Sequence, residues 1–239
     1  MDILLVLIVI IFTIVQSIFG VGLLVFGTPS LLLLGYSFTE TLAYLLPCSI
    51  VVSSLQVYSN WHSITLYRLN VFYYLLPFVA LGLLLVLRIT IINLYLLIGI
   101  MLIFTAFIRF HSSLNEYLGN VLMTKFKLGL AIVGFVHGLT NLGGAPLVTI
   151  TNSIYNKKAI IQSNIAYAYL TMAIVQLIVL ILAGDFMFNI MVLILPFFSV
   201  GTYLLVGKKV FEITDEIIYS NLMSFFILIY GIVLILNSF

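Results

Sequence analysis

The feature that most constrains this chain is a series of long apolar runs, each ended by one of its few charges. The runs cover roughly residues 3–35, 41–58, 71–87, 91–108, 128–154, 159–182, 186–206 and 217–236. Most of them are close to the ~20 residues with which a helix crosses a bilayer. Only 7% of the 239 residues are charged, against about 25% in a typical soluble domain. The sequence therefore predicts an all-α polytopic membrane protein.

Charge and cysteine content exclude several other classes. The net charge is +2 without a basic tract, so we expect no nucleic-acid binding. The single cysteine, Cys48, allows no intrachain disulfide, and three scattered histidines give little support to a metal site. The first run follows Asp2 rather than a basic segment, and is interpreted as mature structure and not as a signal peptide. We expect no metal and no cofactor.

Two of the runs are too long or too interrupted to be ordinary spans. Residues 3–35 would extend about 50 Å as one helix, well beyond a bilayer core of about 30 Å. Glycine and proline break helices, so both of these runs are predicted to contain a break. The breaking residues are Gly20, Gly22, Gly27 and Pro29 in the first run, and Gly134, Gly138, Gly143, Gly144 and Pro146 in the run 128–154.

The two broken runs begin the two copies of an internal repeat. Gly27-Thr28-Pro29 recurs as Gly144-Ala145-Pro146, 117 positions later, and segment 70–82 recurs as 189–201, 119 positions later. Repeats of this kind build many transporters, with the binding site where the halves meet. We expect a first repeat at 1–110, a cytoplasmic linker at 111–127 and a second repeat at 128–239. Each repeat would be a broken segment followed by three transmembrane helices.

The distribution of Lys and Arg distinguishes two ways of crossing the membrane. If all eight runs cross once, the basic residues divide four against five. If both broken runs enter and return to their own side, eight basic residues share one side and only Arg88 lies opposite. The second distribution fits the positive-inside rule. It favours six full spans, two re-entrant segments and halves of inverted topology, with eight ordinary spans as the alternative.

The helix breaks are the expected binding site. A break inside a membrane exposes backbone N–H groups that lipid cannot satisfy. If helices restart at Pro29 and Pro146, their N–H groups and positive dipole ends point to the bilayer centre and form an anion site. The residues expected there are Gly22, Gly27, Thr28, Pro29, His137, Thr140, Asn141, Gly143, Gly144 and Pro146. The competing interpretation is that the glycines only allow helices to pack closely.

The titratable side chains favour an anion over a cation. Cation carriers usually need a buried carboxylate, whereas the Asp and Glu residues of this chain are expected at span ends or in loops, with Glu40 as a helix cap. His137 is the one titratable side chain well inside an apolar run. It would let the protein couple a proton to anion movement. The alternative is a neutral histidine bonded to a neighbouring helix.

The second span of each half is unusually polar. Its polar residues are Ser49, Ser53 and Gln56 in the first half, and Gln162, Asn164 and Gln176 in the second. The first three share one helical face. Such a face either lines a hydrated path or joins helices through hydrogen bonds of about 1 kcal/mol each, and the sequence leaves both interpretations open.

The second-half motif resembles that of a known family. Gly134-Phe-Val-His-Gly138-Leu-Thr-Asn-Leu-Gly143-Gly144-Ala-Pro146, followed by Asn156-Lys-Lys and Ser163, resembles the signature of the TauE/SafE sulfite exporter family. The segment 20–35 is similar to that family's first glycine motif, although Leu23 to Phe26 stand where the family is glycine-rich. The resemblance implies an integral plasma-membrane carrier of sulfite, sulfonates or related organic anions.

The expected function is therefore a secondary transporter that exports a small anion by alternating access between the repeats. One alternative is a passive anion channel that uses the same breaks. Another is an intramembrane enzyme, in which Ser53 or Ser163 would pair with His137. The expected location is the plasma membrane of a prokaryote, as a multi-pass protein. The expected partners are a small anionic substrate and the lipid bilayer, not nucleic acid, with a homo-oligomer left open.

Overall fold

Helices form every regular element of the described chain. The structure is a computed structural model that describes residues 3–64, 67–89, 93–155, 157–214 and 216–238. Within these ranges it contains α-helices, one short 3-10 turn and one π turn, and no strand. The predicted all-α class is confirmed.

The helices follow the apolar runs closely. Residues 3–110 form α1 (Ile3–Phe19), α2 (Leu23–Leu33), α3 (Phe38–Ser59), the 3-10 turn η1 (Trp61–Ser63), α4 (Tyr67–Tyr74), α5 (Leu76–Arg88) and α6 (Leu94–Phe110). Residues 126–236 form α8 (Phe126–Thr140), α9 (Gly144–Ile154), α10 (Lys158–Leu182), α11 (Ile190–Thr202), the π turn η2 (Tyr203–Gly207), α12 (Lys208–Ile213) and α13 (Glu216–Leu236).

The segment predicted as a linker contains a further helix. α7 (Ser112–Thr124) occupies most of 111–127, and its residues 113–122 are bent by 108° from α6. This segment was predicted only as a cytoplasmic linker, because it carries polar and charged residues and no long apolar run.

Local capping sets several helix starts. Ser37 Oγ accepts from the backbone N–H of Glu40 at 3.2 Å, and the Glu40 carboxylate accepts from Ser37 N–H at 2.8 Å. This reciprocal capping box begins α3. The prediction that Glu40 is a helix cap is confirmed. Asn93 and Asn189 cap α6 and α11 with their side-chain oxygens.

Four helices in the described ranges are long and apolar enough to cross a membrane. They are Phe38–Ser59, Arg68–Arg88, Lys158–Leu182 and Ile190–Ile213. The bent pair Leu94–Phe110 and Ser113–Leu122 would make a fifth span if it is counted as one. Shorter apolar helices are Ile3–Phe19, Leu23–Leu33, Phe126–Thr140 and Ile227–Leu236.

Both broken segments fold back on themselves. Phe26 of α2 stacks on Phe12 of α1 with ring centroids 5.6 Å apart, although a continuous helix would separate these residues by about 21 Å. A Cβ atom on Gly129 of α8 would lie 3.6 Å from Ile150 Cδ1 of α9, where a continuous helix would give about 30 Å. α1–α2 and α8–α9 are therefore helical hairpins.

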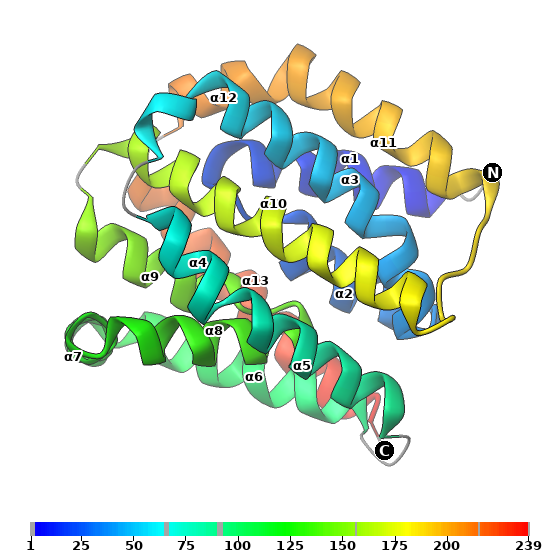
Figure 1. Cartoon of the computed structure of the whole chain (residues 1–239), viewed down its shortest axis with the longest axis horizontal. Helices are drawn as coiled ribbons and strands as arrows, with labels where there is room; N and C mark the ends of the chain where they lie inside the picture. The colour runs from blue at the N-terminus through cyan, green and yellow to red at the C-terminus, as the bar shows by residue number, and fades with distance from the viewer. Residues whose placement is uncertain (1–2, 65–66, 90–92, 156, 215, 239) are drawn as a thin grey trace.

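The two halves of the chain exchange helix contacts. α5 packs against α8 of the second hairpin, and α11 packs against α1 of the first; α3 packs against α10, and α6 against α13 (Figure 1). Glycine permits the closest of these contacts, since a Cβ atom on Gly138 would lie 2.2 Å from Val79 O, and one on Gly134 would lie 2.3 Å from Leu75 O. For these two glycines, close packing accounts for the residue.

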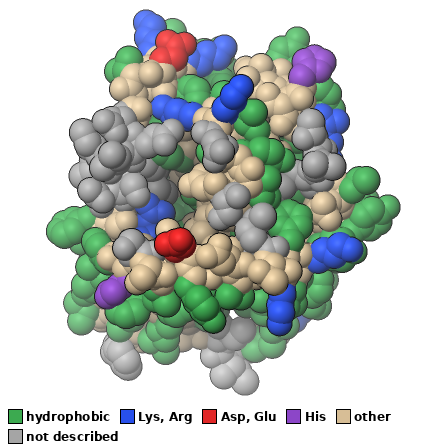
Figure 2. All heavy atoms as spheres, turned by 90° about the vertical axis from the view of Figure 1, so that its left-hand side faces the viewer, with side chains coloured by type: hydrophobic (Ala, Val, Ile, Leu, Met, Phe, Trp, Pro, Cys, Tyr) green, Lys and Arg blue, Asp and Glu red, His purple; other side chains and the backbone are tan. Residues whose placement is uncertain are grey.

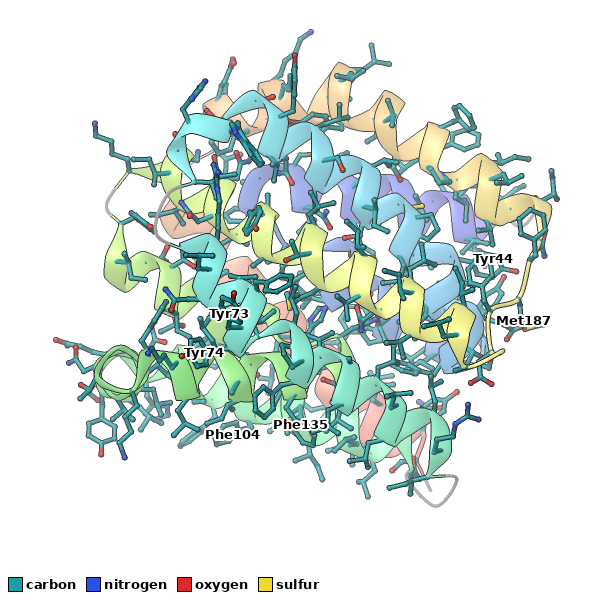
Figure 3. All side chains as sticks on the ribbon, viewed as in Figure 1. Tyr44, Tyr73, Tyr74, Phe104, Phe135 and Met187 are labelled. Carbon is teal, nitrogen blue, oxygen red and sulfur yellow. The ribbon has the colours of Figure 1, made fainter. Side chains whose placement is uncertain are left out.

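Basic residues gather at one end of the molecule. Lys and Arg side chains are frequent on the face at the left of Figure 1, which Figure 2 shows directly. Near this end Arg68 lies over the Trp61 ring at 4.1 Å, and Lys127 over the Tyr74 ring at 5.0 Å. The first turn of α1 and the last turn of α13 lie at the opposite end (Figure 1). There Arg88 donates to Ala183 O, and Figure 3 places Tyr44 and Met187.

Candidate functional site

The first break lies at residues 20–22, between α1 and α2. Gly20 has a φ of 73°, in the left-handed region that disfavours residues with a Cβ atom. A Cβ atom on Gly20 would also lie 3.0 Å from Gln162 O, and one on Gly22 would lie 2.5 Å from Gln16 N. Glycine is therefore required where the chain turns back against the end of α1.

The Gln16 side chain accepts a hydrogen bond from the backbone N–H that begins α2 at the first break. Its side-chain oxygen accepts from the first N–H of α2, at Leu23, over 3.3 Å. Its amide nitrogen donates to Ser53 Oγ at 3.0 Å and approaches Ser49 O and Oγ at 3.4 Å. Gln16, Ser49 and Ser53 are fully buried. The side chain thus supplies a partner to a helix N-terminus that would otherwise lack one.

Two further side-chain amides donate hydrogen bonds to the backbone carbonyl groups at the end of α1, beside the first break. Gln56 Nε2 donates to Gln16 O at 2.9 Å and to Ser17 O at 3.3 Å. Gln162 Nε2 donates to Ser17 O and, at 3.4 Å, to Ile18 O. The last carbonyls of a helix have no partner within it, and here side chains from α3 and α10 provide them. Hydrogen bonds of the protein itself thus hold the first break on both sides.

The second break lies at residues 141–143, between α8 and α9. Asn141 has a φ of 62° and is the only residue other than glycine with a positive φ in the described ranges. Its Nδ2 donates to Thr28 Oγ1 of α2 at 2.9 Å, and its Oδ1 accepts from Gln176 Nε2 of α10 at 2.8 Å. All three side chains are fully buried. A polar chain therefore joins the first hairpin, the second break and α10.

Several buried polar atoms at the second break have no hydrogen-bond partner. They are both ring nitrogens of His137, the Tyr169 hydroxyl and Gln176 Oε1. The His137 and Tyr169 rings meet edge to face with centroids 5.2 Å apart. Gln176 lies beside the imidazole, but without the geometry of a hydrogen bond to it. Buried polar atoms are normally paired, so this cluster has the chemistry of a binding site.

The start of α9 lies in the same cluster. A Cβ atom on Gly144 would lie 2.3 Å from Tyr169 Oη and 2.8 Å from Val25 Cγ2, so the hydroxyl sits directly against the first residue of the helix. The first N–H groups of a helix have no partner within it, and they carry the positive end of the helix dipole. The tyrosine O–H, an imidazole N–H and these N–H groups are all donors, which is the arrangement that an oxyanion requires.

The structure brings together some of the predicted site residues and separates others. Thr28, His137, Asn141, Gly144 and Gln176 converge at the second break. Ser49, Ser53, Gln56 and Gln162 converge at the first, together with Gly22. Asn164 lies elsewhere, because its side chain donates to Ser63 O and Ile160 O. Thr140 Oγ1 donates to Val136 O and accepts from Leu142 N, within its own hairpin.

The predicted position of the first helix restart is wrong. α2 begins at Leu23, and Pro29 lies inside it, so the first break precedes the Gly-x-Pro motif. Gly27 is also inside α2, where a Cβ atom would meet Leu45 Cδ1 at 2.8 Å. Pro146 is the third residue of α9, close to the predicted position. The remaining glycine, Gly143, packs against His137, with a Cβ atom at that position only 2.6 Å from His137 Cβ.

Two residues on which the breaks depend, Gln16 and Tyr169, were not predicted from the sequence. Gln16 is a polar residue within a long apolar run, four positions before Gly20. A polar side chain so close to a predicted break indicates that it binds the backbone there. Tyr169 gave no such signal, because the chain has 14 tyrosines and burial distinguishes this one only in the fold. In the described ranges no serine pairs with His137, and no three His, Cys, Asp or Glu side chains converge.

Apolar spanning helices, two hairpins and buried polar breaks between the halves are the features of a membrane transporter. The family model described as "Sulfite exporter TauE/SafE" matches residues 5–234, nearly the whole chain. The chain therefore belongs to the TauE/SafE sulfite exporter family, a family of multi-pass membrane transporters and not of enzymes. No curated protein and no solved structure matches the chain.

Proposed function

We propose that this protein exports sulfite, a sulfonate or a related small anion by alternating access, and that the anion binds at the second break. The observation that carries the proposal is the set of buried atoms without partners at His137 and Tyr169, beside the start of α9. Leaving such an atom unpaired costs about 1–3 kcal/mol. The oxygens of a sulfite or sulfonate accept hydrogen bonds, and would satisfy these donors together.

The absence of charged groups among the described buried side chains supports an anion as the substrate. In the described ranges the buried polar side chains are neutral amides, hydroxyls and one histidine, with no Asp, Glu, Lys or Arg among them. Glu40 is held in its capping box, and Glu116 and Glu212 are exposed. A cation at the breaks would therefore meet no opposing charge from these residues.

The two hairpins support re-entrant segments and inverted repeats. Each hairpin returns to the end of the molecule from which it starts, as the predicted arrangement with six full spans requires. Basic residues gather at the end that would then be cytoplasmic (Figure 2). Each hairpin also packs against a helix of the other half, α5 on α8 and α11 on α1. Movement of one half against the other would therefore move both breaks, which is what alternating access needs.

The proposal is tested by Tyr169→Phe, which removes one hydroxyl and little else. Purified protein in liposomes should give saturable uptake of labelled sulfite, and the variant should lower kcat/KM by about 10-fold or more, because hydrogen bonds to charged groups contribute about 1.5–3 kcal/mol. The ligand-free variant should melt no lower than the wild type, since the lost hydroxyl has no partner. The matched control is Tyr95→Phe, whose hydroxyl donates to Leu32 O at 2.9 Å; it should lower Tm and leave KM unchanged.

Each alternative gives a different result. Flux that rises linearly with sulfite concentration and is insensitive to Tyr169→Phe would indicate a channel in place of a carrier. Normal saturable flux in the variant would remove the second break as the binding site. Absence of flux for sulfite and for sulfonates would overturn the proposed substrate class.

A further inference from the structure

A cavity of about 360 Å³ lies between the basic end of the molecule and the first break. Its walls come from α7, α9 and the start of α10, and its inner surface includes Ile18 and Val21 at the break. Asn152 and Glu116 line it and are exposed, so the cavity is open to solvent. Among the predicted site and path residues only Gln162 lines it.

Within the described part of the chain, two cationic side chains line this cavity, and both are partly buried. They are Arg109 from the end of α6 and Lys158 from the start of α10. Each of them makes hydrogen bonds that orient it: Arg109 Nε donates to Ser224 Oγ at 2.9 Å, and Lys158 Nζ donates to the carbonyl oxygens of Phe211 at 2.7 Å and Thr214 at 3.1 Å. The two carbonyl oxygens fix the Lys158 ammonium group without neutralising its charge.

The remaining polar lining suits an oxyanion. Asn115, Asn120 and Asn152 bring amide donors, and Gln162 connects the cavity to the carbonyl groups of the first break. The volume accommodates a sulfonate together with several waters, since one water takes about 30 Å³ in the liquid. Among the residues that the structure describes, Glu116 is the one acidic residue that lines the cavity, at an exposed position.

We propose that this cavity is the inner vestibule of the transporter and that Lys158, together with Arg109, draws the anion into it. The inference rests on the proposed function and adds residues at which the anion binds before it reaches the breaks. A cleft lined by charges of one sign concentrates ions of the opposite sign and raises their rate of entry. Lys158 and Arg109 therefore favour anions at entry, whereas Glu116 opposes them.

The charge of the vestibule can be measured without transport. Cys48, the single cysteine, is fully buried, so Asn152→Cys adds one accessible thiol. Its modification rate is measured with a sulfonate-bearing and a trimethylammonium-bearing methanethiosulfonate reagent. Lys158→Gln should lower the ratio of the anionic to the cationic rate at least threefold, and Glu116→Gln should raise it. The matched control is Lys209→Gln, an exposed lysine at the same end that does not line the cavity; it should leave the ratio within 1.5-fold.

Screening of the charges by salt tests their effect on the labelling rates, and this test does not depend on how a variant folds. Salt at about 1 M shortens the Debye length to about 3 Å, and should bring the rate ratios of all variants together. Because Lys158 also holds Phe211 and Thr214, the exposed Glu116→Gln variant tests the vestibule independently of any folding defect. Unchanged ratios in both variants would overturn the inference.

Transport separates this inference from the proposed function. In inverted membrane vesicles Lys158→Gln should raise KM for sulfite at least threefold with kcat within twofold, and Lys158→Arg should restore KM. Wild-type flux with an unchanged KM in Lys158→Gln would remove the vestibule role and leave the carrier intact. No wild-type flux would remove the proposed function, while the labelling ratios would still report the charge of the cavity.

Discussion

Asn141 donates a hydrogen bond to Thr28 over 2.9 Å, joining two fully buried side chains 113 positions apart in the chain. Because Gln176 donates in turn to Asn141, the bond between the two halves also reaches α10. The second break is therefore held from three helices, α2, α8 and α10, and its geometry depends on both halves at once.

Thr28→Val tests this connection. The substitution keeps the shape of the side chain but removes the acceptor, leaving Asn141 Nδ2 buried without a partner. We expect a loss of about 1–3 kcal/mol in the free energy of unfolding, measured by thermal melting in detergent, and a lower kcat/KM for sulfite. Thr28→Ser keeps the hydroxyl and should stay close to the wild type. A wild-type free energy of unfolding and kcat/KM in Thr28→Val would show that the hydrogen bond does not matter at this position.

Gly144→Ala tests the close contact at the start of α9. The added Cβ atom would lie 2.3 Å from Tyr169 Oη, so the ring must move and the donors must separate. Sulfite flux should fall at least 10-fold. Gly201→Ala in α11 is the matched control, because a Cβ atom there meets nothing within 4 Å, and flux should remain within twofold. If both variants transport normally, the second break tolerates an added methyl group and its contact with Tyr169 is not needed for transport.

Gln56→Leu tests the hydrogen bonds that close the first break. Gln56 Nε2 bonds Gln16 O and Ser17 O, and leucine would leave both carbonyls with one partner fewer. Stability should fall by about 1–3 kcal/mol, seen as a lower Tm of the purified protein. Ser59→Ala, at an exposed position at the end of the same helix, should change Tm by less than a degree or two. A Tm unchanged in Gln56→Leu would mean that water replaces the amide without loss.

The sidedness of introduced cysteines tests the re-entrant segments. In the arrangement with six full spans, Lys125→Cys and Lys209→Cys face the same side and Arg88→Cys the other. With eight ordinary spans, positions 125 and 209 face opposite sides and position 88 joins 209. Labelling with an impermeant maleimide in right-side-out and inverted vesicles separates the two patterns. Cys48 is fully buried and should not label in either.

The helices could be predicted because each one repeats a simple signal. An apolar run of about 20 residues ended by a charge or a polar cap predicts a spanning helix, and α3 and α10 follow their runs to within a few residues. α7 could not be found in this way, because polar and apolar residues alternate along it and leave no long apolar run. Its position across the basic end follows from the bend after α6, which no residue pattern encodes.

The existence of the two breaks could be predicted from the sequence, but their positions in the chain could not. The Gly-x-Pro motifs are 117 positions apart, whereas the left-handed residues at the breaks, Gly20 and Asn141, are 121 apart. The reason is that a left-handed residue turns the chain, while Pro29 is accommodated inside α2. Asn141 reaches this conformation because asparagine adopts it more readily than other residues with a Cβ atom. Tyr169 and Lys158 enter the site only through tertiary packing.

The donors at the second break are a tyrosine hydroxyl, the N–H of a neutral imidazole and the first amides of a helix. None of these groups carries a formal charge, and this has a consequence for energetics. If the protein exports an anion on such groups, as proposed above, the anion keeps its own charge as it crosses, and every cycle would move net negative charge outward. An inside-negative potential of 100 mV would then contribute about 2.3 kcal/mol for each charge. For a monovalent anion this corresponds to a concentration ratio of about 50 across the membrane. The resting voltage of the cell would thus expel the substrate without a second ion.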